Sequence, residues 1–470
     1  MNKISRRKFI QGSVVAVGAS ATAALAASCA PAPTVENKPA AAVSEKIALR
    51  YTHWGNEDEK ASTGALLKRF EELNPNITVE QIHIPEAGDP FLQKLTAMAA
   101  SNTLPDASLF PDLNAVDWAM KDMFLDISAE FVGDHEKLEA IQYRTPDGKL
   151  FSASVANEIM AIWYNKDVFD EDKQTYIPIK GADSMQWDDF LKLAKFLTKD
   201  AKGNRGDSAN FDPDNIDRFG FQMGLWWMPV NTIVRSAGGD WTTRDYKKLT
   251  LDTPETINGL QLISDLMNVH HVMPKLTSGG GISDVSTDNG LLSKKIVMKM
   301  DGQWVLETLA KVRKESKLNL GIGVLPFVKE KVTTSVGGPI CAFKTSKHPV
   351  EAARLAAFVM DPEQALAVIQ GGLWMPNEKR WYTDPALTSK WIDNDAHPKE
   401  YKSAIVDYAL GHVTHPLWSF RAPGFTGFDQ IITPALQDVW QGKKTAAEAI
   451  AEISPVAQAY FEKEVLPLMG

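Results

Sequence analysis

The segment GKLFSASVANEIMAIWYNKDVF, residues 148–169, contains two apolar runs on either side of the polar pair Asn157 and Glu158. Each run is rich in apolar and aromatic residues and has the length of a single strand. We therefore expect a strand, a short polar break at residues 157 and 158, and a second strand.

Strand-like and helix-like segments alternate on the amino-terminal side of this stretch. Such alternation predicts a parallel sheet with helices on both faces, which is an α/β fold. Ligands in such sheets bind at the carboxyl ends of the strands, where this sequence places His53 and Trp54 and, later, Phe110 to Asp112. The expected strands are residues 46–54, 75–84 and 106–110, and the expected helices are residues 62–74 and 90–101.

The carboxyl-terminal side continues with alternating elements and ends in helices from Pro349 onward. A helix over residues 184–198 is expected to be capped by Asp183 or Ser184. Glycines are expected to stop a helix over residues 231–240. Further strands are expected within residues 218–228, 318–327 and 337–343, a helix over residues 253–267, and a strand, a turn and a helix over residues 293–312.

The first 45 residues have the features of an export signal followed by a tether. Residues 1–28 contain a basic start with paired arginines, Arg6 and Arg7, and a weakly apolar stretch, which is typical of a twin-arginine signal peptide. Cys29 ends a stretch similar to a lipoprotein box, although its aliphatic residue lies one place earlier than usual, so cleavage without lipidation stays open. Residues 29–45 are rich in Pro and Ala and are expected to form a flexible tether. The predicted location is periplasmic or at the cell surface, with a lipid anchor at Cys29.

Composition excludes several classes of function. The chain has 470 residues, which predicts two lobes rather than one core. Without the four basic residues of the signal, 46 basic residues stand against 59 acidic ones, a net charge of −13, which argues against nucleic acid or anionic lipid as a partner. After Cys29 the only cysteine is Cys341, which cannot form an internal disulfide and lies in an apolar run typical of a buried side chain.

The order of the segments resembles the family 1 extracellular solute-binding proteins, the sugar-capturing components of ABC importers. The similarity spans roughly residues 46–465, and WYNKDVF (residues 163–169) and DGQW (residues 301–304) are its most telling pieces. The other pieces, in order, are FEELNPNITVE, LPDASLF, QWDDFLKLAKFLTK, AGGDWTTRD, TLDTPETINGLQLISDLM, and GIGVLPF followed by GGPICAF and HPVEAARLAAFV.

This resemblance implies two α/β lobes joined by a multi-strand hinge, with the ligand held between them. It implies a first lobe of residues 46–156 plus 305–341 and a second lobe of residues 159–303 plus 345–470. It also implies a hinge near residues 157–158, 303–304 and 341–342. The implied partners are a small-molecule carbohydrate and the permease subunits of an importer. No enzyme activity, cofactor or metal is expected, and the chain is expected to be a monomer that touches a membrane only through Cys29.

Carbohydrate binding requires flat aromatic rings for the C–H faces of a sugar and short polar side chains for its hydroxyl groups. The chain has 13 Trp against 9 Tyr, and several Trp residues follow predicted strands. By the resemblance, Trp304 stacks on a sugar, and Trp226 or Trp227 lies where the family has an aromatic residue and a carboxylate. The candidate ligand-binding residues are Trp54, Asn56, Glu57, Phe110, Asp112, Asn114, Asn157, Glu158, Trp226, Trp227, Asp301, Trp304, Gly337, Gly338, Trp374, Trp418, Arg421 and Phe428.

Alternatives remain at this point. The same fold could bind a polyamine, because aromatic residues lie beside acids, or a glycerol phosphate ester, although no Arg/Lys cluster follows the strands. A glycoside hydrolase would need a carboxylate pair, for which Asp112, Glu158 and Asp301 are candidates. The acidic loop at Asp212–Asp217 lacks the glycine and terminal glutamate of a calcium loop, and we leave calcium binding there open.

Overall fold

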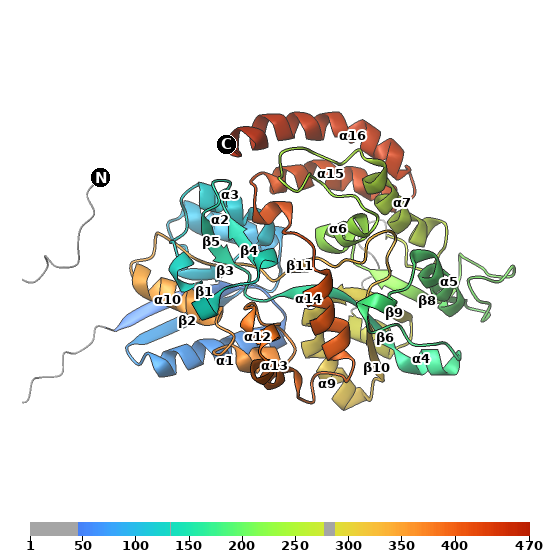
Figure 1. Ribbon diagram of the computed structural model, residues 1–470, viewed down its shortest axis with the longest axis horizontal. Helices are drawn as coiled ribbons and strands as arrows, with labels where there is room; N and C mark the ends of the chain where they lie inside the picture. Colours follow the sequence, from blue (N-terminus) through green and yellow to red (C-terminus); the bar gives the residue numbers. More distant parts are fainter. Residues whose placement is uncertain (1–45, 132, 277–286) are drawn as a thin grey trace, which may run out of the picture. The chain divides into compact units, whose positions relative to one another are not determined.

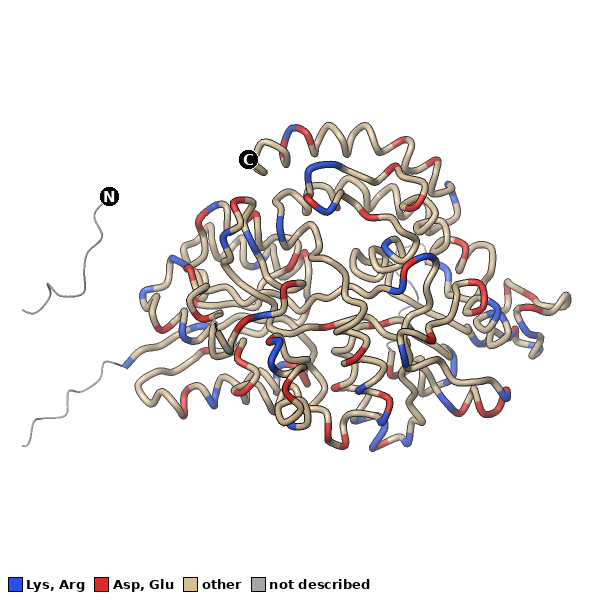
Figure 2. The backbone as a smooth tube through the Cα atoms, in the orientation of Figure 1, with Lys and Arg blue, Asp and Glu red and all other residues tan. Residues whose placement is uncertain are grey.

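The computed structural model describes residues 46–131, 133–276 and 287–470. The predicted signal peptide, the tether and Cys29 lie outside the described residues, as does the glycine-rich stretch at residues 278–284. Within the described part, residues 46–470 belong to one compact unit. No helix of that part is long and apolar enough to cross a membrane. Acidic and basic residues are interspersed along its helices and loops, without a long run of one sign (Figure 2).

The first sheet has four strands in the order β12-β3-β1-β2. β1 runs parallel to β2 and β3, with Tyr51 opposite Gln81 and Ala107, whereas β12 is antiparallel to β3. The carboxyl ends of β1, β2 and β3 therefore lie at one edge, as the alternating pattern predicts. The strands are β1 (Ile47–His53), β2 (Ile77–His83), β3 (Ala107–Leu109) and β12 (Ile340–Ala342), and the helices around them are α1 (Glu57–Leu73), α2 (Asp89–Ala100), α3 (Ala115–Met120), α10 (Pro349–Val359) and α11 (Leu366–Gln370) (Figure 1).

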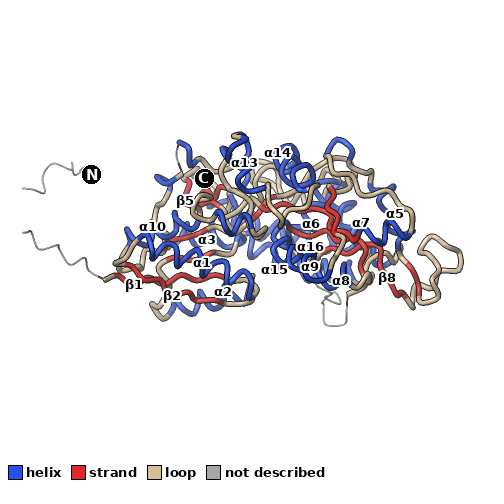
Figure 3. The backbone as a smooth tube through the Cα atoms, turned by 90° about the horizontal axis from the view of Figure 1, so that it is seen from below, coloured by secondary structure: helices blue, strands red, loops and turns tan. Residues whose placement is uncertain are grey.

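The second sheet is mixed. Its order is β10-β6-β9-β8-β7, and β11 also pairs with β6. β8 and β9 are parallel, but β6 is antiparallel to β9 and to β10. Figure 3 shows its strands as a group separate from those of the first sheet. The strands are β6 (Glu158–Asn165), β7 (Lys199–Asp200), β8 (Ile216–Met223), β9 (Ile296–Gly302), β10 (Leu320–Gly323) and β11 (Ser335–Val336).

Helices and a small hairpin complete the described part. The hairpin β4 (Gln142–Arg144) and β5 (Leu150–Ala153) precedes β6. Besides short 3-10 helices, the remaining helices are α4 (Lys166–Glu171), α5 (Trp187–Leu197), α6 (Trp227–Ser236), α7 (Pro254–Asn268), α8 (Thr287–Leu292), α9 (Leu306–Ser316), α12 (Arg380–Thr383), α13 (Pro385–Ile392), a π-helix (Lys402–Asp407) that continues into α14 (Tyr408–His412), α15 (Phe425–Trp440), and α16 (Ala446–Tyr460), which a short π-helical turn (Phe461–Val465) follows.

Three helix starts differ from the sequence prediction, and one of them is that of α6, which begins at Trp227 rather than at the expected residue 231. α1 begins at Glu57, well before the expected residue 62, because Asn56 and Glu59 form a capping box. The Asn56 side chain accepts from the Glu59 N–H at 3.0 Å, and the Glu59 carboxylate accepts from the Asn56 N–H at 2.7 Å. α5 is preceded by Gln186, which makes no side-chain cap, so neither Asp183 nor Ser184 caps this helix.

Strand pairing changes the predicted lobe boundaries. Two strands of the segment 305–341, expected in the first lobe, belong to the second sheet, because β10 and β11 both pair with β6. Conversely, α10, expected in the second lobe, packs against β12 and β3 of the first sheet. These pairings join residues that are far apart in the sequence. The local pattern of residues does not reveal such pairings.

The positions at which the chain crosses from one sheet to the other also differ from the predicted hinge positions. The chain leaves the β4–β5 hairpin and enters β6 at Glu158, at the predicted first crossing. The next crossing lies at Gly337–Pro339, between β11 and β12, rather than at residues 341–342, which lie inside β12. The chain does not cross at residues 303–304, because β9 before them and β10 after them are in the same sheet.

A buried ion-pair network supports the first crossing. The Glu378 carboxylate is fully buried and lies 3.0 Å from the Lys137 ammonium and 2.8 Å from the Arg380 guanidinium. Lys137 also donates to the Met360 carbonyl and to the Asn377 side chain, each at 3.1 Å. The Asn377 amide in turn donates to the carbonyls of Ser154 and Val155. His135, Asp361 and Glu378 have the spacing of metal ligands, but the Lys137 ammonium already neutralises Glu378.

Replacing Lys137 with methionine is expected to destabilise the protein by about 3–5 kcal/mol, because it removes a partner of a buried carboxylate. Urea unfolding measures this change. The control is Lys192→Met, which removes a surface pair with Asp189, where both side chains are more than half exposed; it should cost no more than about 1 kcal/mol. Equal shifts in the two variants would contradict a stabilising role for the Lys137–Glu378 pair.

Candidate ligand-binding site

A cavity of about 640 Å³ lies where strand ends of the two sheets converge. The first sheet contributes the residues after β1 and β3, beginning at Trp54 and Pro111. The second sheet contributes Trp226 and Trp227 after β8 and Trp304 after β9. The predicted residues that line the cavity are Trp54, Asn56, Asp112, Asn114, Glu158, Trp226, Trp227, Trp304, Gly337, Gly338 and Trp374.

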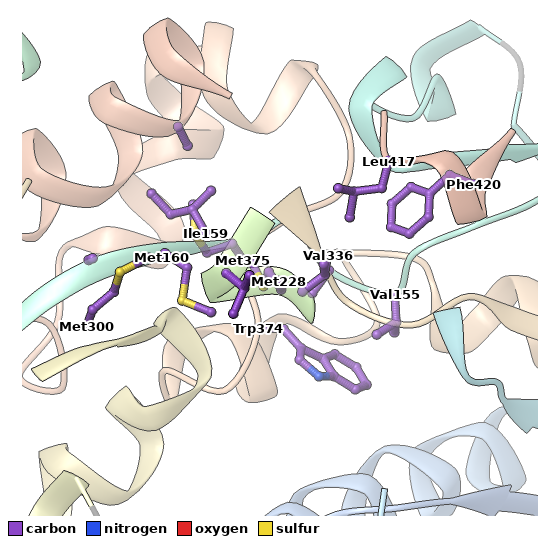
Figure 4. Packing of buried hydrophobic residues seen from close by; sticks show 14 of the residues in the cluster. Val155, Ile159, Met160, Met228, Met300, Val336, Trp374, Met375, Leu417 and Phe420 are labelled. Atoms are coloured by element: carbon purple, nitrogen blue, oxygen red, sulfur yellow. The ribbon is translucent and has the colours of Figure 1, made fainter. Parts of the chain in front are cut away.

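Indole rings form much of the cavity wall. The Trp226 ring lies 5.4 Å from Trp227, nearly perpendicular to it, and 6.1 Å from Trp304. Trp226 is 39% exposed, an unusual state for so large an apolar side chain. Figure 4 shows Trp374 beside the packed side chains of Val336 and Met375. This arrangement leaves aromatic surface available to a ligand from more than one direction.

Two glycines permit close approaches at this site. Gly55 has φ +131°, and a Cβ there would lie 2.1 Å from a carboxylate oxygen of Glu59. Gly338 has φ +69°, and a Cβ there would lie 2.7 Å from a Leu109 methyl group and 2.9 Å from the Trp54 ring. A side chain at either position would displace a cavity residue and strain the backbone.

Asp112 and Glu59 are carboxyl groups held in place by hydrogen bonds. The Tyr143 hydroxyl donates to Asp112 at 2.5 Å, and the Gly338 N–H donates to the same oxygen at 3.3 Å. Burial raises the pKa of Asp112 to about 6, despite these hydrogen bonds. Burial also raises the pKa of Glu59 to about 7, opposed by its hydrogen bond from the Asn56 N–H. Both groups therefore titrate near neutral pH.

Glu158 differs from these two acids because nothing in the described chain donates to it. The residue is 8% exposed and lines the cavity at the start of β6. No described residue forms a hydrogen bond or ion pair with its carboxylate. Burial raises its pKa well above the usual value, and the nearby Glu59 and Asp112 raise it further. A buried carboxyl group of this kind either keeps its proton or needs a ligand as partner.

Acidic side chains on the cavity wall have no cationic counterpart there. Asp89 and Asp429 line it together with Glu59, Asp112 and Glu158, and among the described residues no Lys or Arg lines it. His53 supplies no charge either, because burial lowers its pKa to about 4. The two nitrogens of its ring are already engaged, one with the Trp54 carbonyl and one with the Gln81 amide, each at 2.8 Å.

Seven predicted site residues lie away from the cavity wall, and three of them lie in or next to strands. Phe110 is fully buried in a cluster with Trp118, Phe124 and Phe343, because it points to the core face at the end of β3. Asn157 is buried and bonded to the Tyr382 and Ser335 hydroxyls at the crossing. Asp301 accepts from the Thr287 hydroxyl at 2.5 Å, so a pairing with Asp112 or Glu158 is not built into this cavity.

The remaining predicted residues off the cavity wall lie on α1 and near α15. Glu57 is exposed in the first turn of α1, where helical geometry turns Glu59 inward instead. Trp418 and Phe428 are buried against each other, 4.9 Å apart, in the carboxyl-terminal core. Arg421 donates to the Gln142 carbonyl and pairs with Glu139 at 2.7 Å.

Several cavity residues were not predicted. The β2–α2 loop contributes Pro85, Ala87 and Gly88, and the rule for parallel strand ends, applied to β2, would have found them. Asp429 comes from α15, far along the chain, and no local signal marks it. The other additions are Tyr51, His53, Gly55, Glu59, Thr63, Asp89, Leu109, Pro111, Leu113, Val336 and Leu373.

The acidic loop considered for calcium is held by its own hydrogen bonds. The Asp200 carboxylate accepts from the backbone N–H groups of Lys202, Asn204 and Asp212. The Asn215 amide donates to Asp212 at 2.9 Å. These donors occupy oxygens that a cation would need, and the only described cluster with metal-ligand spacing is the one around Glu378.

Known proteins share both the sequence pattern and the fold. The family described as bacterial extracellular solute-binding protein matches residues 65–397. A putative binding protein of Brucella abortus is 22% identical over 410 residues, covering 84% of this chain and 89% of that one. Maltose-bound MalE3 of T. maritima has a TM-score of 0.69 at 18% identity, over 88% and 99% of the two chains. UgpB of Mycobacterium tuberculosis, solved with glycerophosphocholine, has a TM-score of 0.69 at 17% identity, over 88% and 98%.

These similarities agree with the geometry described above. The structural matches extend over nearly the whole described chain, so its α/β architecture is that of the two-lobe binding proteins. The family match covers most of the chain, including β6, the crossings and the tryptophans after β8 and β9. The chain therefore belongs to the bacterial extracellular solute-binding protein family, the substrate-binding components of ABC importers.

Proposed function

We propose that this protein captures a carbohydrate in the cavity and delivers it to the permease of an ABC importer. The observation that carries the proposal is the set of indole rings at the cavity, Trp54 on one side and Trp226 and Trp304 on the other, interleaved with carboxyl groups. Indole rings offer flat apolar area for the C–H faces of a pyranose. Carboxylates accept hydrogen bonds from its hydroxyl groups. Maltose in the related T. maritima protein is consistent with this assignment.

Closure of the two lobes is the proposed signal to the permease. Residues from both sheets line the cavity, so a ligand that touches both stabilises the closed arrangement. α1 of the first sheet already contacts α9 of the second, where the Ser62 hydroxyl donates to Glu307 at 2.6 Å and Lys311 pairs with Asp58 at 2.5 Å. These contacts join helices next to the two sheets, so they are expected to change when the lobes move.

The proposed site of action is outside the cytoplasmic membrane. The extracellular family supports export, and the paired arginines Arg6 and Arg7 support a twin-arginine route. We further propose that Cys29 is lipidated and that the Pro/Ala-rich segment tethers a monomeric receptor near its permease. We propose binding without turnover, in keeping with a family of solute receptors.

A phosphate ester is the less favoured cargo. UgpB shares this fold and was solved with glycerophosphocholine. A phosphate group is commonly bound by Arg, Lys or a helix N-terminus. Here the cavity wall contains five carboxyl groups and, among the described residues, no Lys or Arg, so the wall repels an anion.

Replacing Trp304 or Trp226 with alanine is expected to weaken sugar binding about 10- to 100-fold, or about 1.4–2.8 kcal/mol, through loss of stacking area. Titration calorimetry with the tightest sugar ligand measures the change. The control is Tyr176→Ala, which removes another partly exposed aromatic ring that does not line the cavity. Unchanged affinity in both tryptophan variants would remove these rings from the binding site.

A carbohydrate ligand is expected to raise the melting temperature, because it binds only the folded chain. At 100 times its Kd a ligand stabilises by about 2.7 kcal/mol. A thermal-shift screen measures this rise in melting temperature. The screen compares neutral and amino sugars of one to four units with polyamines and glycerol phosphate esters. Shifts with phosphate esters alone would reject the carbohydrate proposal, and release of a chromophore from a glycoside, abolished by Asp112→Asn, would indicate a hydrolase.

A further inference from the structure

Glu158 combines three properties that point to a ligand group. The residue is more than nine-tenths buried, it lines the cavity, and no described residue donates to its carboxylate. It cannot move elsewhere, because its backbone pairs with Val336 of β11 at the start of β6. A ligand in the cavity can therefore reach its carboxylate.

The cavity wall carries acidic groups without a cationic side chain beside them. Glu59, Asp89, Asp112, Glu158 and Asp429 offer carboxylate oxygens, and among the described residues no Lys or Arg lines the wall. The wall also offers donors, chiefly the indole N–H groups of its tryptophans, but these donors are uncharged. A hydroxyl group both donates and accepts, whereas an ammonium group has three donors and carries the charge opposite to that of a carboxylate. The charge of the wall therefore complements an ammonium group better than a set of hydroxyls.

Resting on the proposed carbohydrate function, we propose that the ligand is an amino sugar whose protonated amine binds Glu158, with Asp112 and Glu59 nearby. The indole rings suit the same ligand. A cation over an indole face gains electrostatic attraction in addition to the stacking of the sugar ring. Trp226 and Trp304 lie on the same cavity wall as these acids.

The groups that face Glu158 reinforce its negative field. Glu59 approaches from α1, with Asp58 and Glu307 beside it, and Asp112 approaches from the loop after β3. Tyr401, at the start of the π-helix, is uncharged near neutral pH because burial raises its pKa. No basic residue among those described offsets this group of acids within the cavity. An ammonium group would supply the missing charge.

Binding of an ammonium group in the cavity should release protons rather than take them up. In the empty cavity, burial raises the pKa of Asp112 to about 6 and that of Glu59 to about 7, so these two groups are partly protonated near pH 6, and burial also raises the pKa of Glu158. An ammonium group favours their ionised form and lowers their pKa, so binding should release protons. A neutral sugar with a hydroxyl in the same place carries no charge to drive this release.

The test titrates the mature chain at pH 6 with three matched pairs: glucosamine and glucose, galactosamine and galactose, and diglucosamine and cellobiose. At this pH an amine of ordinary pKa is protonated. We expect at least one amino sugar to bind about 100-fold tighter than its hydroxyl counterpart. Calorimetry in buffers of different ionisation enthalpy should show proton release for the amino sugar only.

Two variants test whether the preference for the amino sugar depends on the carboxyl group of Glu158. Glu158→Gln keeps the shape and removes the charge, and it should bring the amino sugar and its counterpart within about fivefold of each other and reduce the proton release, since only Asp112 and Glu59 then contribute to it. Its melting temperature without ligand should equal or exceed that of the wild type, because an uncompensated buried acid is removed. The control, Glu57→Gln, changes an exposed acid of α1 off the cavity wall and should leave the preference unchanged.

The outcomes separate this inference from the proposed function. Equal affinity for both members of every pair, or a preference that persists in Glu158→Gln, overturns the amino-sugar inference and leaves carbohydrate capture intact. Binding of spermidine but of no sugar, lost in Glu158→Gln, supports an ammonium partner for Glu158 and overturns carbohydrate capture. Binding of neither the sugars nor spermidine overturns both.

Discussion

The fully buried strand β6 is the constraint on which the arrangement depends. All eight of its residues are buried, and it pairs with β9 along one edge and with β10 and β11 along the other. A strand held on both edges cannot slip in register without turning its side chains to the wrong faces. Its first residue is Glu158. The same pairing that holds the second sheet together therefore fixes a carboxyl group at the cavity.

The buried carboxyl groups of Glu378 and Glu158 differ in the partners that surround them. Glu378 is surrounded by Lys137, Arg380 and His135, so its charge is compensated within the chain and supports the crossing segment. Glu158 has no such partners among the described residues. Leaving a buried acid uncompensated lowers stability. This contrast supports the proposed role of Glu158 in binding a ligand group rather than in folding.

The sequence predicts the local elements well and the long-range pairing poorly. Strand ends identified from the alternation of apolar segments led to Trp54 and Asp112, and the family resemblance led to Trp304; all three line the cavity. Phe110 follows an apolar run and Trp418 lies in a Pro/Gly-rich segment, but both point into packed cores, and which face such a residue takes depends on neighbours distant in the sequence. The lobe boundaries failed for the same reason, since β10 is recruited to β6 from more than 150 residues away.

Glu59 and Asp429 show two further limits of prediction. Glu59 lies two positions from the predicted Glu57, and only the true start of α1 at its capping box decides which of the two acids turns inward. Asp429 reaches the cavity on α15, whose place is set by packing against α7 and α16. No local pattern in the sequence carries that information.

Both sheets contribute acids and indole rings to the cavity. Trp54, Glu59 and Asp112 follow strands of the first sheet, whereas Trp226 and Trp304 follow strands of the second sheet, whose β6 begins with Glu158. A ligand bound to one sheet alone would leave the rings and acids of the other sheet without contacts. Because a ligand shifts a conformational equilibrium only by its differential affinity for the two states, this placement makes the closed arrangement the one that a ligand touching both sheets prefers. Selectivity and closure thus follow from the same placement of residues.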